Sequence, residues 1–352
     1  MRDNSHLPVA IVGQGLAGTL LAWQLYQRHQ PFTVFDLPRP GAASRVAAGI
    51  VNPIIGSRLT LDPDLVNELP VAEACYKALS AHLGAKLYRP IPILRRLTSD
   101  AEKQQWIRRR QDPAYQLWLN ASAHCPDAFE VNGGGWLDTR TLLDKARSWL
   151  SEAGLLQPAV FDPALLDTRS GYCQYQQNNY RAVIFCEGAA VIHNPWFKRL
   201  PWVPAKGDIL EGHTESVLSP TLRNDGHWLL PTDQHRFRVG ATWSQCDDDP
   251  GPDPEAKRAL QAVATRLLGP THSFSITGHE SGLRPSTRDF KPVMGPHPEQ
   301  PGLWVFNGFG ARGVARMPAG SLALVGALLD GQPLPTHKSI TRRLCVRSLN
   351  QA

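Results

Sequence analysis

The sequence lacks any hydrophobic run long enough to cross a membrane. None of its apolar stretches reaches 18 residues, and the longest candidate, 322–329, would form only one or two buried helical turns. Residues 1–7, which precede the first expected strand, are too few and too polar for a secretory signal peptide. We therefore expect no integral membrane segment and a location in the cytoplasm.

Metal-binding patterns are missing as well. The twelve histidines are scattered, and none has a partner at the spacing of a metal-ligand pair. The six cysteines form no C-x-x-C pair and have the scatter of reduced thiols without a shared role; they are at positions 75, 125, 173, 186, 246 and 345. The sequence therefore predicts no metal site.

Basic residues only slightly outnumber acidic ones. The formal net charge is +6, which suits an anionic small molecule and would also suit RNA, so it selects neither. Arg108, Arg109 and Arg110 form a short basic run. This run could be a nucleic-acid patch, but a solvated helix end is favoured because cations are stabilised near the carboxyl terminus of a helix. A tRNA partner stays open but is not favoured.

The most informative stretch lies near the N-terminus. Residues 9–12 (Val-Ala-Ile-Val) predict a buried strand, and the glycine-rich segment 13–18 predicts a turn into a helix. An apolar-periodic run continues to residue 30, and residues 32–35 predict a second strand. A strand, a glycine turn, a helix and a strand are the layout of a dinucleotide-binding βαβ unit.

Each residue type in this unit has a physical reason. Gly13 permits a tight turn, Gly15 lets the backbone approach a pyrophosphate, and Gly18 lets the helix pack closely on the strand. Asp36 follows Gly18 by 18 residues and can accept hydrogen bonds from an adenosine ribose. The unit therefore predicts adenine dinucleotide binding; a glycine-rich turn in some other α/β protein is the alternative.

A segment of small residues follows Asp36. Residues 37–53 would pass close to the cofactor, where bulky side chains would block the backbone. Ser44 is expected to cap a short helix whose N-terminal amides face the phosphates. A surface loop with a helix cap is the alternative.

The central part of the chain continues the α/β pattern. Periodicity predicts helices over 62–83, 99–110 and 140–153, and strands over 158–161 and 180–189. The second of these strands is a continuous apolar run, which is typical of a parallel strand buried on both faces. Gly188, near its carboxyl end, would lie at the ligand crevice of the sheet.

The segments after residue 200 change character. Short alternating strands over 205–211, 228–231 and 237–243 predict an antiparallel sheet, and a helix over 254–268 would close it. The tail then predicts a strand over 303–306, a glycine-rich turn over 307–313 and a helix over 314–329. The N-terminus of this last helix would be a second site suited to binding an anion.

These elements predict an α/β fold, α+β overall, in which a Rossmann-like dinucleotide-binding domain carries an inserted, mainly antiparallel β domain. We expect a discontinuous nucleotide domain over 1–75, 133–200 and 275–352. The substrate or cap domain would comprise 76–132 and 201–274.

A set of motifs occurs in order along nearly the whole chain: 13–18, Asp36, Ser44-Arg45 with Ala48-Gly49, Cys186-Glu187-Gly188, 282–285 with Thr287, Asp289 and Pro292, and Gly308-x-Gly310-Ala311-Arg312-Gly313. Together they resemble the FAD-dependent D-amino acid oxidase and glycine oxidase family. The closing residues 331–335 and the late Gly-Ala-Arg-Gly are similar to the oxidase half of a bifunctional enzyme that modifies the wobble uridine of tRNA.

The chain departs from the family pattern in three places. It has Ala43-Ser44 where the family often has two serines, and Glu187 replaces the usual threonine of an Ala-Thr-Gly strand end. Where sarcosine oxidases attach flavin to a cysteine, this chain has 282–284, Gly-Leu-Arg. The resemblance therefore implies FAD that is bound without a covalent link.

The resemblance also implies which residues contact the flavin nucleotide. Arg312 matches a family arginine beside the flavin, with a surface arginine at a helix start as the alternative, and the amides of 311–314 would face the pyrimidine edge of the ring. The implied cofactor-binding residues are Gly13, Gly15, Leu16, Ala17, Gly18, Asp36, Ser44, Arg45, Ala48, Gly49, Val160, Cys186, Glu187, Gly188, Gly308, Gly310, Ala311, Arg312, Gly313 and Val314.

Arg284 is the candidate for binding a substrate carboxylate. A guanidinium binds a carboxylate through two parallel hydrogen bonds and would thereby fix the α-carbon. A salt bridge to Asp289 is the alternative. We assign Arg284 and Arg312 as the catalytic candidates.

Three functions stay open. The favoured one is an amine or amino-acid oxidase or dehydrogenase, which passes a hydride from the carbon of a C–N bond to FAD. The others are a tRNA-modifying oxidoreductase that acts on a carboxymethylaminomethyl-uridine-like group, and an NADPH-dependent flavoprotein monooxygenase. Against the last, no second nucleotide fingerprint follows residue 18. The electron acceptor, oxygen or a quinone, is not determined.

Overall fold

The first structural layer is a six-stranded sheet built around β1 (Val9–Val12). The computed structural model describes residues 6–122, 125, 127–168, 172–245 and 251–340. β1 pairs in parallel with β2 (Phe32–Phe35) and with β15 (Ala182–Phe185). The full strand order is β11-β2-β1-β15-β23-β22, in which β11 is Leu156–Gln157, β23 is Leu303–Asn307 and β22 is Val293–Pro296.

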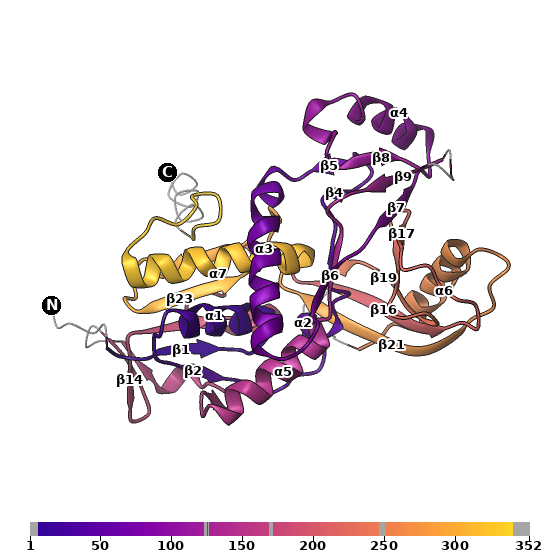
Figure 1. Cartoon of the computed structure of the whole chain (residues 1–352). Helices are drawn as coiled ribbons and strands as arrows, with labels where there is room; N and C mark the ends of the chain where they lie inside the picture. The colour runs from indigo at the N-terminus through magenta and orange to yellow at the C-terminus, as the bar shows by residue number, and fades with distance from the viewer. Residues whose placement is uncertain (1–5, 123–124, 126, 169–171, 246–250, 341–352) are drawn as a thin grey trace.

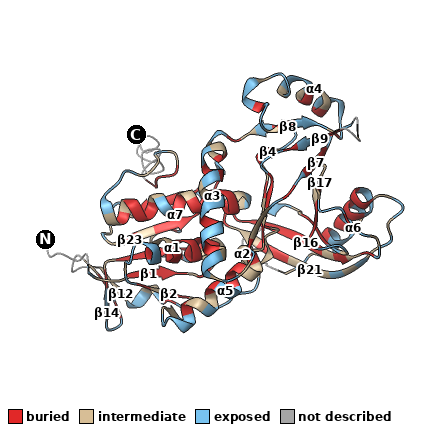
Figure 2. Cartoon of the chain, viewed as in Figure 1, coloured by how far each residue is buried: buried red, intermediate tan, exposed pale blue. Residues whose placement is uncertain are grey.

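Helices cover one face of this sheet. All four residues of β1 and of β15 are buried, because both faces of these strands are covered. α1 (Leu16–Gln27) and α7 (Gly313–Asp330) lie side by side over one face, and α3 (Pro63–His82) crosses α7 (Figure 1). Figure 2 shows that the sheet-facing sides of α1 and α7 are almost wholly buried.

The opposite face packs against an aromatic cluster. Phe35 and Phe185 contact Phe161 edge-on, and Phe161 stacks on Tyr175 at a centroid distance of 4.0 Å. Tyr175 belongs to a small antiparallel sheet made of β12 (Leu166–Asp167), β13 (Cys173–Tyr175) and β14 (Asn178–Tyr180).

The second layer is a nine-stranded sheet with the order β20-β16-β19-β18-β17-β7-β9-β8, to which β21 adds by pairing with β16. All of its pairs are antiparallel except β17 with β7. The bounds are β20 (Ser244–Gln245), β16 (Ala205–His213), β19 (Arg236–Gly240), β18 (Trp228–Pro231), β17 (Leu222–Asn224), β7 (Ile93–Arg96), β9 (Ala128–Val131), β8 (Leu119–Ala121) and β21 (Ser275–Arg284).

The amphipathic helix α6 (Pro254–Leu268) buries its apolar side on one face of this sheet. α4 (Asp100–Arg109) lies at its far end, beside β8 and β9 (Figure 1). The remaining elements are α2 (Ala43–Val46), β3 (Ile50–Val51), β4 (Ile54–Ile55), β5 (Thr60–Leu61), β6 (Tyr88–Pro90), β10 (Gly135–Leu137), α5 (Thr139–Glu152) and the 3-10 turns Pro113–Tyr115, Pro163–Leu165, Gly188–His193 and Gly310–Arg312.

The fold class expected from the sequence is confirmed, with local corrections. The strand expected over 158–161 is wrong: the pairing with β2 uses Leu156–Gln157, since Pro158 has no amide to donate to a ladder. β21 pairs with β16 over its whole length, so by strand pairing the inserted sheet extends to Arg284 instead of ending at residue 274. The expected boundary at residues 75 and 76 falls inside α3.

Two kinds of feature were not found in the part of the chain with described coordinates. Within it, no helix combines the length and hydropathy that spanning a bilayer requires. The same residues contain no group of three or more His, Cys, Asp or Glu side chains that could hold a metal ion.

Candidate active site

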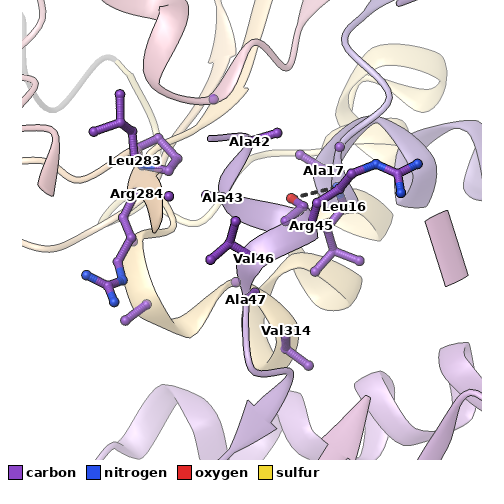
Figure 3. Close-up of a pocket in the computed structure, with 18 of the residues that line it drawn as sticks. Leu16, Ala17, Ala42, Ala43, Arg45, Val46, Ala47, Leu283, Arg284 and Val314 are labelled. Carbon is purple, nitrogen blue, oxygen red and sulfur yellow. Dashed lines mark hydrogen bonds between the residues drawn. The ribbon is translucent and has the colours of Figure 1, made fainter. Parts of the chain in front are cut away.

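A continuous cavity of about 870 Å³ runs between the two sheets. It begins where β1, β2 and β15 end, which is the edge where open α/β sheets bind ligands. Figure 3 shows α2 inside this region, with Leu16 and Ala17 on one side of it and Leu283 and Arg284 on the other. Of the residues predicted to form the site, all line the cavity except Gly18 and Gly308.

The glycine turn is shaped by close backbone contacts. Gly13 has φ of +103°, and a Cβ there would lie 2.6 Å from the carbonyl oxygen of Cys186. A Cβ on Gly18 would clash with the carbonyl oxygen of Gly13, so Gly18 lets α1 approach the strand. Gly15 precedes α1, and neither a capping side chain nor an acidic residue occupies that helix start. The amide of Leu16 donates to Ser44 Oγ, and the amides of the first turn that follow it suit a phosphate.

Asp36 is held by two donors. Its Oδ1 accepts from the amide of Gln14 at 2.9 Å, and its Oδ2 accepts from Arg147 Nη1 at 2.8 Å. Arg147 also donates to Gln14 Oε1. The sequence did not identify Arg147, because it is contributed by α5, far along the chain, and belongs to no motif.

Ser44 has a different role from the one expected. α2 begins at Ala43 with Ala42 as an uncapped N-cap, so Ser44 does not cap the helix. Its Oγ accepts instead from the amide of Leu16, at 3.0 Å, and ties α2 to the start of α1. Arg45 forms an ion pair with Asp144 on α5.

Arginines from outside the motif bind the carbonyls at the end of α2. Arg238, on β19, donates from Nη1 to the carbonyl of Ala47 at 2.8 Å and from Nη2 to that of Val46 at 2.7 Å. Arg140 Nε donates to the carbonyl of Arg45. Burial lowers the pKa of Arg238 to about 10, and Arg140 contributes to that shift. The inserted sheet therefore holds the segment that the resemblance places along the flavin.

The segment then ends at a constrained glycine. Gly49 has φ of +78°, and a Cβ there would clash with the carbonyl oxygen of Leu137. Ala48 accepts a hydrogen bond through its carbonyl from Trp136 Nε1 at 2.9 Å.

The end of β15 places Cys186, Glu187 and Gly188 at the cavity. Burial raises the pKa of Glu187 to about 7, although Asn194, whose Nδ2 donates to Oε2 at 2.7 Å, lowers it in part. Burial also raises the pKa of the Cys186 thiol well above its usual value, which keeps it neutral. Val160 lies at the cavity edge and is exposed.

The late glycine motif forms the opposite wall. Residues 310–314 line the cavity, with a 3-10 turn over Gly310–Arg312 leading into α7. Gly308 lies away from the cavity, where a Cβ would meet Thr287 and Trp202. Arg312 Nη1 pairs with Asp62 Oδ2 at 2.7 Å, and the buried Arg316 bonds the same oxygen.

Arg284 extends from β21 over Gly207, whose missing side chain makes room for the guanidinium. Its Nη1 donates to the carbonyls of Lys206 and Thr242, each at 3.3 Å. Burial lowers the pKa of Arg284, and nearby Asp208 opposes that shift. Among the residues with described coordinates Arg284 makes no ion pair, so the alternative of a bridge to Asp289 is wrong.

The residues present fit FAD. Bare backbone at Gly13 and Gly15, the start of α1 without an acidic residue in its first turn and the fixed carboxylate of Asp36 together suit a pyrophosphate joined to an adenosine. The fold and site thus define a dinucleotide-binding protein with a separate β-sheet over its cavity.

The family model described as FAD dependent oxidoreductase, DAO, matches residues 8–325. The chain belongs to this family, and the predicted FAD dependence is confirmed.

Proteins of known function are similar over almost the full length. Glycine oxidase of Pseudomonas putida is 29% identical, with 93% of this chain and 95% of the relative covered. The structure of iminodiacetate oxidase from Chelativorans sp. BNC1 matches with a TM-score of 0.78 at 22% identity, covering 94% of this chain and 98% of that one.

A third relative bears on the RNA alternative. The tRNA 5-methylaminomethyl-2-thiouridine biosynthesis bifunctional protein MnmC of Marinobacter nauticus is 21% identical, over 96% of this chain and 58% of its own length. The set of matches favours C–N bond oxidation over the other two predicted functions.

Proposed function

We propose that this protein oxidises the C–N bond of an amino acid or N-substituted amino acid to an imine. FAD, when bound, supplies the hydride acceptor. The chain's own residues hold the cofactor, anchor the substrate carboxylate and keep water from the reacting carbon.

The observation that carries the proposal is the lack of an acidic partner for Arg284. Its guanidinium is half-buried, faces the cavity and has only backbone carbonyls as partners among the described residues. A poorly solvated cation without a carboxylate partner favours an anionic ligand. An amino-acid carboxylate supplies that charge and leaves the neighbouring carbon at a defined place.

Arg312 receives a different assignment. Asp62, the N-cap of α3, already pairs with it, so we propose that Arg312 fixes the start of α7 and does not bind substrate. The amides of 311–314 would then be held toward the flavin, where a helix start stabilises negative charge. The contacts predicted for the other cofactor-binding residues stay part of this proposal.

We also propose that the two sheets have separate roles. The six-stranded sheet and its helices would hold FAD, and the nine-stranded sheet would cover the substrate. A cytoplasmic enzyme that returns its electrons to oxygen or to a quinone is the form that we favour, with no tRNA partner.

The test is anaerobic bleaching of the bound flavin by a panel of amino acids and N-alkyl amino acids, with NADPH as the control for the monooxygenase alternative. Arg284→Ala should weaken binding of carboxylate substrates by roughly 30-fold to several thousand-fold, the equivalent of about 2–5 kcal/mol. Arg284→Lys should recover only part, since an ammonium lacks the planar fork. An amine without a carboxylate should be affected much less. Equal loss on both substrates would contradict the assignment.

A further inference from the structure

The cavity continues well beyond the groove that suits the cofactor. It extends across the inner face of the nine-stranded sheet, past Ile209 and Trp228, to Asn224 and Arg95. Ile54, Ile55, Gly56 and Ser57 line the same part. We call this part of the cavity the distal arm. A substrate of two or three carbon atoms anchored at Arg284 would leave it empty.

Strand register gives the length of the distal arm. Ile209, Gly240, Trp228, Asn224 and Arg95 are paired neighbours on consecutive strands, β16, β19, β18, β17 and β7. Four inter-strand spacings of about 4.8 Å amount to about 19 Å. The Arg284 guanidinium lies over Gly207, two residues before Ile209 and on the same face of β16. Arg284 and Arg95 therefore lie at opposite ends of this row of paired residues, which we call the track.

The middle of the track is apolar and flat. A Cβ on Gly240 would lie 2.7 Å from Cζ2 of Trp228 and 3.1 Å from Cγ1 of Ile209, so the indole covers the bare backbone of Gly240. Ile54 and Ile55 contribute further apolar surface. Such a surface suits a methylene chain or a ring.

The far end is polar and offers donors. Arg95 is paired with Glu102 at 2.6 Å, and its other terminal nitrogen bonds Asn224 Oδ1. Glu102 also accepts from the amide and hydroxyl of Thr98, so its oxygens are occupied. Arg95 Nε is buried without a partner, and no described residue accepts from Asn224 Nδ2. Arg95 and Asn224 therefore offer N–H donors here, while Glu102 balances the charge of Arg95.

We propose that the distal arm is a second substrate subsite, which takes a long substituent of the amino acid and binds an acceptor oxygen at its end. The inference rests on the proposed function, in which Arg284 holds the α-carboxylate. The substrate class is an amino acid whose substituent has an apolar middle and a terminal carbonyl or carboxylate.

The first experiment compares chain lengths. Glycine, sarcosine, N-alkylglycines and N-(ω-carboxyalkyl)glycines are mixed anaerobically with the FAD-loaded protein, and the half-saturating concentration for flavin reduction is measured for each. We expect it to fall at least about tenfold from sarcosine to the best long substrate, and further when the chain ends in an oxygen group. Reduction by sarcosine with a steady rise in this concentration as the chain lengthens would overturn the subsite alone. Reduction by none of them would overturn the proposed function and the subsite with it.

The second experiment uses variants of the distal arm. Asn224→Leu should lower the preference for the oxygen-ended substrate, measured as the ratio of half-saturating concentrations against the N-alkylglycine of equal length, by roughly 3- to 10-fold, the worth of one hydrogen bond. Ile55→Trp should fill the track and shift the ratio of long to short substrates in favour of short ones. Asn120→Leu, on β8 of the same sheet and outside the cavity, is the matched control and should leave both ratios as they are. Ratios that do not respond to Asn224→Leu and Ile55→Trp would overturn the proposal.

Discussion

Arg147 of α5 and Asp36, which directly follows β2, form an ion pair at the edge of the cavity, with 2.8 Å between Nη1 and Oδ2. Both side chains are partly buried, at 24% and 19% exposed. The carboxylate that the sequence assigns to the adenosine ribose is thus oriented by a cation some hundred positions away. The guanidinium also offsets the repulsion between this carboxylate and a nearby pyrophosphate.

Replacing this cation should weaken cofactor binding. Arg147→Met leaves Asp36 with the Gln14 amide as its remaining described partner, and we expect the Kd for FAD to rise about tenfold, or ~1.4 kcal/mol. Titration of the apoprotein with FAD, followed by quenching of flavin fluorescence, measures it. Lys145→Met, an exposed residue of the same helix, is the control. A Kd equal in Arg147→Met and wild type would show that the pair is incidental.

A substitution in the glycine turn should affect FAD binding more strongly. A Cβ on Gly15 would lie 3.2 Å from Ser44 Oγ, and the rest of a valine side chain would enter the space reserved for the pyrophosphate. Gly15→Val should therefore abolish FAD retention while the circular dichroism spectrum stays that of the wild-type apoprotein. Full flavin occupancy in this variant would mean that the fingerprint is misassigned.

Arg238 couples the inserted sheet to the segment after α2. Arg238→Met leaves the carbonyl of Val46 without its described side-chain donor, leaves that of Ala47 with Thr139 alone, and leaves Glu211 with one cation fewer. The apoprotein should therefore lose about 3 kcal/mol of unfolding free energy. Urea unfolding monitored by tryptophan fluorescence provides the value. Arg236→Met on the same strand removes an exposed ion pair and should cost no more than about 1 kcal/mol. Similar losses in the two variants would refute the coupling.

Glu187 should make the stability of the apoprotein depend on pH. Its folded pKa of about 7 lies above the usual value for a glutamate, so the folded state binds more protons than the unfolded state between about pH 4.5 and 7. Stability from this group is therefore lost as the pH rises through that window. Glu187→Gln should match the wild type near pH 4.5 and exceed it by about 2–3 kcal/mol at pH 8, as measured by urea unfolding at both pH values. A constant difference across pH would contradict the assigned shift.

Local patterns were enough to predict the N-terminal unit. Val9–Val12, the glycines and Asp36 are close in sequence, and each one's conformation is set by its neighbours, so the elements of this unit were identified correctly. The strand expected at 158–161 failed for a local reason, because Pro158 interrupts the ladder after Gln157.

Side-chain partners could not be predicted in the same way. Arg147, Arg238 and Asn224 act through residues more than a hundred positions away, and no periodicity encodes such contacts. Ser44 was placed at the cavity correctly but given the wrong partner, since a capping preference cannot reveal that the Leu16 amide lies within reach. Arg312 lies at the cavity as expected, but the sequence cannot reveal that Asp62, 250 positions away, is its partner.

The most direct test of the central claim is to identify the product of a single anaerobic turnover. The FAD-loaded protein is mixed with an excess of an N-substituted amino acid in the absence of oxygen, and the carbonyl compound released by hydrolysis of the imine is quantified against the flavin reduced. The account predicts one equivalent of carbonyl compound and one of amine for each FAD bleached. Bleaching by NADPH alone, or bleaching by the substrate with no carbonyl product, would contradict C–N bond oxidation by this site.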